Sequence, residues 1–154
     1  MYALLQTQRI EAPAEAVFAF FSDPANLARI TPPWLSFRIH GAMPRPLAEG
    51  SRIEYRIRWT VFRLRWVTRI QRWRPPTEFQ DTQEKGPYAF WLHTHRFTPS
   101  GSGVLMEDRV EYALPFGILG RVVHALRVRR QLEEIFEYRR KAIDAIYPAR
   151  TVAR

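Results

Sequence analysis

The feature that most constrains this fold is a regular alternation of apolar residues with arginines in the middle of the chain. Tyr55 and Trp66 belong to the apolar set, and most of the residues between its members are charged. Because successive side chains of a strand point to opposite faces, the pattern predicts half-buried strands over Arg52–Val61 and Arg63–Trp73. One face of the resulting sheet is apolar, and the other is rich in arginine.

Shorter runs with the same period extend this sheet along the chain. Proline and glycine clusters separate the runs at the spacing of hairpins rather than of strand–helix–strand units, so an antiparallel sheet is expected. The further strands are predicted over Leu4–Ile10, Leu35–His40, Thr77–Gln83, Gly86–Phe97 and Val104–Tyr112.

The period changes after the last of these strands. Apolar residues such as Leu132 and Phe136 recur at helical spacing, which predicts one long helix from about Ile118 to Tyr147. At 1.5 Å per residue such a helix is roughly 40 Å long, enough to cross a whole sheet. Two short helices are predicted earlier, over Ala14–Ser22 and from Asp23 to about Ile30.

These elements predict an α+β protein with a curved antiparallel sheet wrapped around its C-terminal helix. The apolar sheet face needs a cover, and the last helix is the one large element that can supply it. The two short N-terminal helices are expected at one end of the sheet. We predict a single domain over residues 1–148, followed by a frayed tail at residues 149–154.

Composition excludes several kinds of chemistry. The 154 residues include no cysteine, which excludes disulfides, thiolate nucleophiles and cysteine-based zinc sites. The chain has no nucleophile elbow, phosphate-binding loop, dinucleotide fingerprint or zinc-protease motif, so we expect no cofactor. Neither a signal-peptide pattern nor a membrane-spanning apolar run occurs, and a cytoplasmic protein is expected. The net charge of +9 makes anionic partners a further hypothesis.

Several segments resemble one known superfamily. They are Ile10–Phe18 (IEAPAEAVF), the Asp23–Leu27 turn, Trp91–Phe97 (WLHTHRF) and Met106–Tyr112 (MEDRVEY). With the amphipathic last helix they resemble the START and Bet v 1-like superfamily, also called SRPBCC or helix-grip proteins, over residues 3–147. The likeness is to a bacterial subgroup related to polyketide cyclases and lipid-transport proteins. It implies the helix-grip fold, a hydrophobic or amphipathic small-molecule ligand, and association with sugar-nucleotide epimerase-like proteins.

The sheet face under the long helix supplies the candidate ligand-binding residues. An aromatic stripe at strand spacing fits both a filled core and a cavity lining, and we interpret it as a cavity lining. The predicted ligand-binding residues are Tyr55, Ile57, Trp59, Trp66, Thr68, Trp91, His93, His95, Met106, Asp108, Val110, Tyr112, Arg129, Leu132 and Phe136.

Two histidines and one aspartate give this face its polar chemistry. Pairing His93 with Asp108, and His95 with Met106, places all four side chains on one face with opposed Cβ atoms about 5 Å apart. We interpret the trio as a satisfied buried network that orients a ligand. As an alternative, His93 and His95 are acid–base groups of a cyclase- or dehydratase-like enzyme. No metal is expected, because no further ligand is evident nearby.

Arginines supply the remaining candidates. Arg129 and Arg139 lie at the edges of the helix stripe, where one could bind a ligand carboxylate or phosphate, although such side chains more often extend to solvent. The arginines of residues 52–69 share the sheet face opposite the cavity. Such clustering is typical of proteins that bind nucleic acid or an anionic membrane, but solvated sheet faces are also often charged. We therefore predict small-molecule binding, with a cyclase- or dehydratase-like reaction as the alternative and anionic macromolecules as the less favoured partner.

Overall fold

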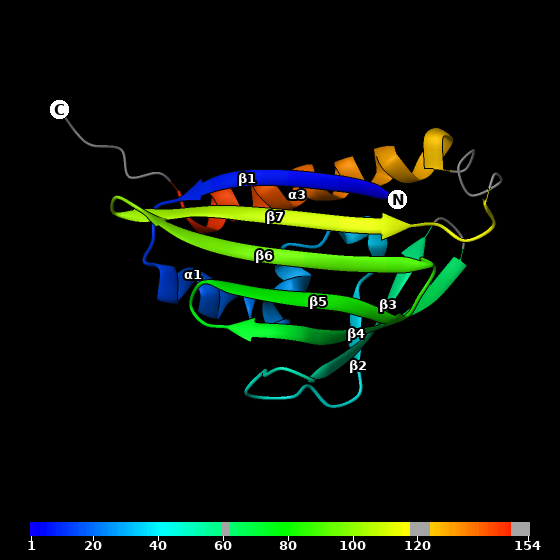
Figure 1. The fold of residues 1–154 in the computed structure, drawn as a ribbon, viewed down its shortest axis with the longest axis horizontal. Coiled ribbons are helices and arrows are strands. Elements are labelled where there is room, and N and C mark those ends of the chain that lie inside the picture. Colours follow the sequence, from blue (N-terminus) through cyan, green and yellow to red (C-terminus); the bar gives the residue numbers. More distant parts are fainter. Residues whose placement is uncertain (60–61, 118–123, 149–154) are drawn as a thin grey trace.

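The structure, a computed structural model, describes residues 1–59, 62–117 and 124–148, apart from the side chains of Trp59, His124 and Ala125. These residues form a seven-stranded sheet with helices on one side (Figure 1). The strands are β1 (Tyr2–Ile10), β2 (Arg38–His40), β3 (Arg52–Trp59), β4 (Phe62–Arg74), β5 (Glu78–Lys85), β6 (Phe90–Ser100) and β7 (Gly103–Ala113). The helices are α1 (Ala14–Phe21), the 3-10 helices η1 (Pro24–Arg29) and η2 (Pro33–Leu35), the π-helix η3 (His124–Val128) and α3 (Arg129–Ile146).

The strand order is β1-β7-β6-β5-β4-β3-β2, and every neighbouring pair is antiparallel. Consecutive hairpins from β2 to β7 build most of the sheet, and β1 returns to pair with β7. Figure 1 shows α3 running along the β1 edge, on the same side of the sheet as α1. The helix-grip fold and the antiparallel order that the sequence predicts are confirmed.

Two of the predicted N-terminal elements differ in detail. The strand expected over Leu35–His40 is extended only at Arg38–His40, because η2 occupies the preceding residues and Ser36 then adopts a left-handed φ of 46°. The second short helix is a 3-10 helix. Its predicted cap is present, since the carboxylate of Asp23 accepts a hydrogen bond of 2.9 Å from the amide of Ala25.

The long C-terminal helix is observed from His124 to Ile146, first as the π-helix η3 and then as α3. Its predicted start at residues 118–123 lies outside the described residues. Leu132, Phe136 and Ile143 are buried. This spacing of apolar residues therefore faces the sheet, as the helical period predicts.

The β6–β7 hairpin has a register that differs from the predicted one by two residues. His95, not His93, lies opposite Asp108, and Phe97 lies opposite Met106. The strands continue to Ser100 and Gly103, so the turn contains only two residues, of which Gly101 has a left-handed φ of 58°. A two-residue shift preserves the side-chain parity, so both histidines and Asp108 still share the inner face.

Two groups of buried side chains hold the helices against this face. Near α1, Phe18 and Phe21 pack on Phe97 with ring centroids 5.6 Å apart, and Ile143 of α3 completes the group. Toward the other end of α3, Leu132 and Phe136 pack with aromatic residues of the sheet. The sheet residues of this second group are Trp66, Trp91, Val110 and Tyr112. The sheet and α3 are thus joined at two separate places.

The two faces of β6 predict different responses to truncation. Phe97 is 1% exposed, whereas Phe90 on the opposite face is 39% exposed. We expect Phe97→Ala to lower the free energy of unfolding by about 4 kcal/mol, from lost burial and a residual cavity. Phe90→Ala, the matched control, should lower it by less than about 1 kcal/mol. Guanidinium chloride unfolding measures both values, and equal losses would contradict the assignment of faces.

Candidate functional site

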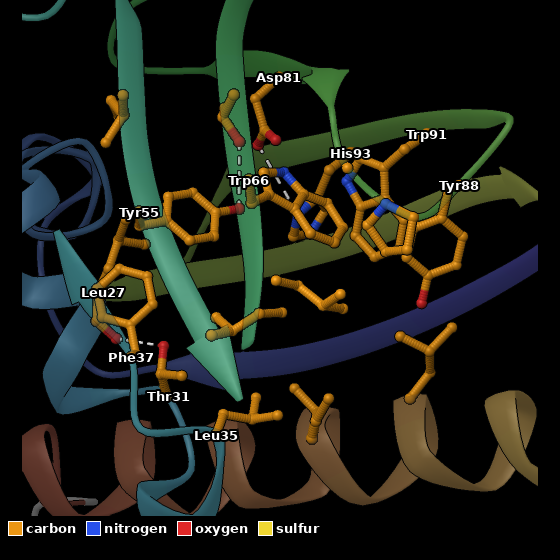
Figure 2. Close-up of a pocket in the computed structure, with 18 of the residues that line it drawn as sticks. Leu27, Thr31, Leu35, Phe37, Tyr55, Trp66, Asp81, Tyr88, Trp91 and His93 are labelled. Atoms are coloured by element: carbon orange, nitrogen blue, oxygen red, sulfur yellow. Dashed lines mark hydrogen bonds and ion pairs between the residues drawn. The ribbon is translucent and has the colours of Figure 1, made fainter. Parts of the chain in front are cut away.

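A cavity of about 730 Å³ lies between the inner face of the sheet and α3. Figure 2 shows strands above this space and the helix below it, with Tyr55, Trp66 and Trp91 on the sheet side. The alternation of β3, β4 and β6 explains the lining, since every second side chain of these strands points inward. The cavity wall is therefore largely aromatic and aliphatic.

Nine of the predicted ligand-binding residues line the cavity. They come from β3, β4, β6 and α3, whose inward faces meet there. These residues are Tyr55, Ile57, Trp66, Thr68, Trp91, His93, His95, Leu132 and Phe136. A binding role for each of them stays a prediction. Trp59 lies at the end of β3, and its side chain is outside the described residues.

Five predicted residues do not line the cavity. Met106 is buried in the group under α1, and Val110 and Tyr112 are buried in the group under α3. Asp108 lies behind the two histidines at 4% exposure. The reason is the strand order, since β7 lies next to β1 at the side where α3 packs, away from the space below β3–β5.

Arg129 is the fifth of these residues, and it points away from the cavity. Its guanidinium pairs with Glu133 at 2.9 Å on the exposed surface of α3. Arg139, the other stripe-edge arginine, lines the cavity instead. The helical period places both residues at an edge of the stripe, so only the packing of α3 on the sheet distinguishes them.

Several lining residues were missed by the sequence analysis. The most important is Asp81 of β5, which shares its parity with Phe79, so strand alternation could have placed both on the inner face. Other missed residues lie in the 3-10 helix η1 or in loops, where the regular periodicity that the sequence predicted for some of these segments does not give the side-chain direction. Among these are Leu27, Thr31, Phe37, Tyr88 and Leu114.

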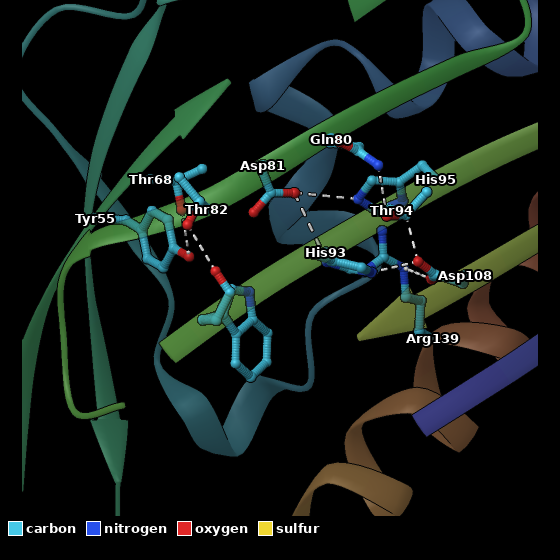
Figure 3. Close-up of polar contacts among 11 residues, drawn as sticks. Tyr55, Thr68, Gln80, Asp81, Thr82, His93, Thr94, His95, Asp108 and Arg139 are labelled. Atoms are coloured by element: carbon cyan, nitrogen blue, oxygen red, sulfur yellow. Dashed lines mark hydrogen bonds and ion pairs between the residues drawn. The ribbon is translucent and has the colours of Figure 1, made fainter. Parts of the chain in front are cut away.

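The polar wall of the cavity is a cluster of five charged or titratable side chains, which we call the β5–β7 cluster: Asp81, His93, His95, Asp108 and Arg139. Figure 3 shows the two imidazoles between the two carboxylates, with Arg139 reaching Asp108 from α3. The imidazole centroids are 3.9 Å apart. A carboxylate therefore lies on each side of the histidine pair.

Asp108 is the inner carboxylate of the cluster. Its Oδ1 accepts a hydrogen bond from Nε2 of His93 and lies 3.0 Å from Nδ1 of His95. Its Oδ2 lies 3.3 Å from Nε of Arg139. Burial alone would raise the pKa of Asp108, but Arg139 and the two imidazoles hold this pKa well below its usual range. The inner carboxylate is therefore ionised.

Asp81 is the carboxylate on the cavity side. Its Oδ2 lies 3.3 Å from Nε2 of His95 and 3.8 Å from Nδ1 of His93. Burial and the neighbouring His95 lower the pKa of His93, whereas for His95 the carboxylates outweigh burial and raise the pKa. Of the two rings, His95 is the one that holds a proton more readily.

The cluster brings together three possible metal-ligand side chains, a grouping that the sequence analysis did not predict. Asp81, His93 and His95 present three ligand atoms within 4.8 Å of one another. The sequence-based expectation of no metal rested on the lack of a third ligand, and β5 supplies that ligand. Two imidazoles and a carboxylate are a donor set that divalent transition metals bind.

The arginine face is only partly neutralised. Arg65 binds Glu54 through two contacts of 2.7 Å, and Arg52 binds Glu84 at 2.7 Å. Among the described residues, Arg38, Arg56, Arg58 and Arg63 form no salt bridge, although they line a groove with His40. Register places Arg38 opposite Arg56 and Arg58 opposite Arg63, so like charges face each other across the strands.

Comparisons with known proteins give a family and a fold. The family model described as polyketide cyclase/dehydrase and lipid transport matches residues 10–136. A search of curated proteins finds no match. None of the helices in the described parts of the chain is long and apolar enough to cross a membrane.

Solved structures with low sequence identity share the fold. TTHA0849 from Thermus thermophilus is 19% identical with a TM-score of 0.70, covering 94% of this chain and 95% of that one. Ara h 8.0201 is 12% identical with a TM-score of 0.62, covering 94% and 98%. A nucleoside-diphosphate sugar epimerase from Corynebacterium glutamicum is 22% identical with a TM-score of 0.66, covering 91% of this chain but only 28% of the epimerase.

The ion pair of Arg139 predicts a large cost for its removal. In Arg139→Met the buried carboxylate of Asp108 loses its guanidinium partner, and we expect a loss of about 3 kcal/mol in the free energy of unfolding. Arg140→Met, one residue further along α3, removes exposed pairs with Glu137 and Asp144 and should change stability little. Denaturant unfolding compares the two variants, and an Arg139→Met protein as stable as Arg140→Met would contradict this account of the cluster.

Proposed function

Because the chain belongs to the polyketide cyclase/dehydrase and lipid-transport family, we propose that it binds a hydrophobic or amphipathic small molecule in the cavity between the sheet and α3. The observation that carries this proposal is the cavity itself. Its volume of about 730 Å³ falls within the range of about 300–1,000 Å³ that ligand sites occupy, and its lining combines apolar walls with one polar cluster.

The two parts of the wall have different roles in this proposal. Burial of the ligand's apolar body against side chains such as Trp66, Trp91 and Ile135 contributes roughly 25 cal/mol per Å² removed from water. The polar end of the ligand lies against His93, His95 and Asp81. Asp108 acts through the imidazoles, which it holds in place from behind. Transport or sequestration of such a molecule requires no chemical step.

Two other predictions are not needed for this function. A cyclase- or dehydratase-like reaction with His93 or His95 as the acid–base group stays a prediction. Association with an epimerase-like protein also stays a prediction, and it is supported by the likeness of this chain to a segment of the Corynebacterium glutamicum epimerase.

A cavity-filling substitution tests the proposed function. Ile135 is half-buried and lines the cavity, so Ile135→Trp should fill part of that space and weaken binding of N-phenyl-1-naphthylamine by about tenfold or more. This neutral probe becomes fluorescent in apolar surroundings. Glu134→Trp places the same side chain on the exposed surface of α3 and should leave probe binding unchanged. Unaltered probe affinity in a folded Ile135→Trp protein would refute binding in this cavity.

A second candidate function is binding of an anionic macromolecule through the arginine face. It is favoured by the four arginines without salt bridges among the described residues, because like charges directly opposite each other destabilise a sheet unless counter-charges bind. The groove and the ligand cavity are distinct pockets that share Ile57 as a lining residue, and both functions can coexist.

Salt dependence tests this second candidate. The double variant Arg56→Gln/Arg58→Gln should bind duplex DNA or phosphatidylglycerol vesicles more weakly and with a shallower dependence on salt concentration than the unmodified chain. Arg129→Gln/Arg130→Gln removes the same charge from α3 and serves as the control. Absence of retention on both probes at low salt would dismiss this candidate.

A further inference from the structure

We propose that Asp81, His93 and His95 bind a divalent transition-metal ion at the wall of the cavity, with Asp108 positioning both imidazoles. This inference goes beyond the proposed function, although the two share one cavity. The ligand atoms are Oδ2 of Asp81, Nδ1 of His93 and Nε2 of His95 (Figure 3).

The sheet brings these three side chains together. Asp81 lies opposite His93 in the β5–β6 register, and His95 follows two residues later on the same face. The Asp81 oxygen lies 3.3 Å from the His95 nitrogen and 3.8 Å from the His93 nitrogen. Metal–ligand bonds of about 2.0–2.2 Å place neighbouring ligand atoms roughly 3.0–3.5 Å apart. All three ligand atoms lie within 4.8 Å of one another, so side-chain movements can bring them to these separations around an ion.

The second nitrogen of each imidazole supports this assignment. When Nδ1 of His93 and Nε2 of His95 bind a metal, the opposite nitrogen of each ring carries a proton. The His93 proton then points to Oδ1 of Asp108, which already contacts Nε2 of that ring, while Nδ1 of His95 lies 3.0 Å from the same oxygen without good hydrogen-bond alignment. A carboxylate behind a metal-bound histidine fixes its tautomer and orientation.

The cluster also leaves buried polar atoms without a well-aligned hydrogen bond. One of them, Nδ1 of His95, is fully buried and makes no hydrogen bond of good geometry although it lies 3.0 Å from Oδ1 of Asp108. Buried polar atoms in folded proteins are nearly always satisfied, and an ion at the site is one accepted reason for an exception. An ion bound at the Asp81 side would fix the His95 ring with its Nδ1 proton toward Asp108.

The charges that face the site favour one cation. With neutral imidazoles, Asp81 and Asp108 carry two negative charges and Arg139 carries one positive charge. Arg139 opposes a cation, but its guanidinium lies on the far oxygen of Asp108 rather than on the ligand atoms. A proton shared by the two histidines would also neutralise the excess negative charge of the cluster. Metal titration distinguishes this protonation from binding of an ion.

The donor set and its surroundings indicate the class of metal. Two nitrogens and one oxygen suit Zn²⁺, Fe²⁺, Co²⁺ or Ni²⁺, whereas Mg²⁺ and Ca²⁺ prefer oxygen ligands. Phe79 stacks on His95 with centroids 4.2 Å apart, and Phe136 lies 5.8 Å from His93, so the walls are apolar. Three protein ligands leave coordination positions open toward the cavity, where an oxygen atom of the bound molecule could complete the shell.

Cobalt titration of the full chain tests the site. We use Co²⁺ because its visible absorption reports its ligands, and the protein is prepared without a histidine tag and dialysed against a chelator. The expected result is binding of one Co²⁺ per chain. Asp81→Asn should weaken this binding at least tenfold, and Asp108→Asn should weaken it by about 10- to 100-fold through the positions of the imidazoles. His40→Gln, which removes an exposed histidine outside the cavity, should change nothing.

Two results would overturn the proposal: no stoichiometric Co²⁺ binding by the unmodified chain, or equal affinity in folded Asp81→Asn and His40→Gln proteins. Thermal unfolding of each variant confirms that the comparison is between folded proteins. Probe binding separates this proposal from the proposed function. If N-phenyl-1-naphthylamine binds but Co²⁺ does not, only the metal site is refuted, and the opposite pair of results refutes only the ligand cavity.

Discussion

The interaction on which the rest of this structure depends is the buried contact between Asp108 and Arg139. A buried carboxylate is costly unless cationic and hydrogen-bonding partners surround it, so Asp108 requires side chains from more than one element. Arg139 provides one partner from α3, and His93 and His95 provide the others from β6. This requirement fixes the position of the last helix along the sheet more narrowly than apolar contacts can, because apolar packing is non-directional.

The cavity results from the two places at which buried side chains hold α3 against the sheet. Buried side chains join α3 to the sheet in two separate groups, one with Ile143 near α1 and one with Leu132 and Phe136. Both groups include residues of β6 and β7, while the inner faces of β3 and β4 contribute chiefly to the cavity wall. The curved sheet therefore reaches over space that α3 does not fill, and the β5–β7 cluster lies between the two groups.

The sequence predicted which face of each strand or helix is buried better than it predicted which residues of other elements lie opposite that face. Alternation placed His93, His95 and Asp108 together even though the predicted register was wrong by two residues, because parity survives such a shift. The helical period could not choose between Arg129 and Arg139, since both lie at a stripe edge and only tertiary packing separates them. Alternation could have given the face of Asp81, but its closeness to His93 and His95 depends on the β5–β6 pairing, a long-range contact that no local pattern specifies.

The charge of the β5–β7 cluster links the two proposals for the cavity. With neutral imidazoles, its two carboxylates outnumber its one guanidinium, so a ligand with an anionic end would meet repulsion from Asp81. A divalent ion between Asp81 and the imidazoles reverses the local sign and offers open coordination positions to the same anionic end. Under the two proposals, the kind of polar group that the cavity accepts depends on whether the metal is bound, while the apolar walls bind the rest of the molecule in either case.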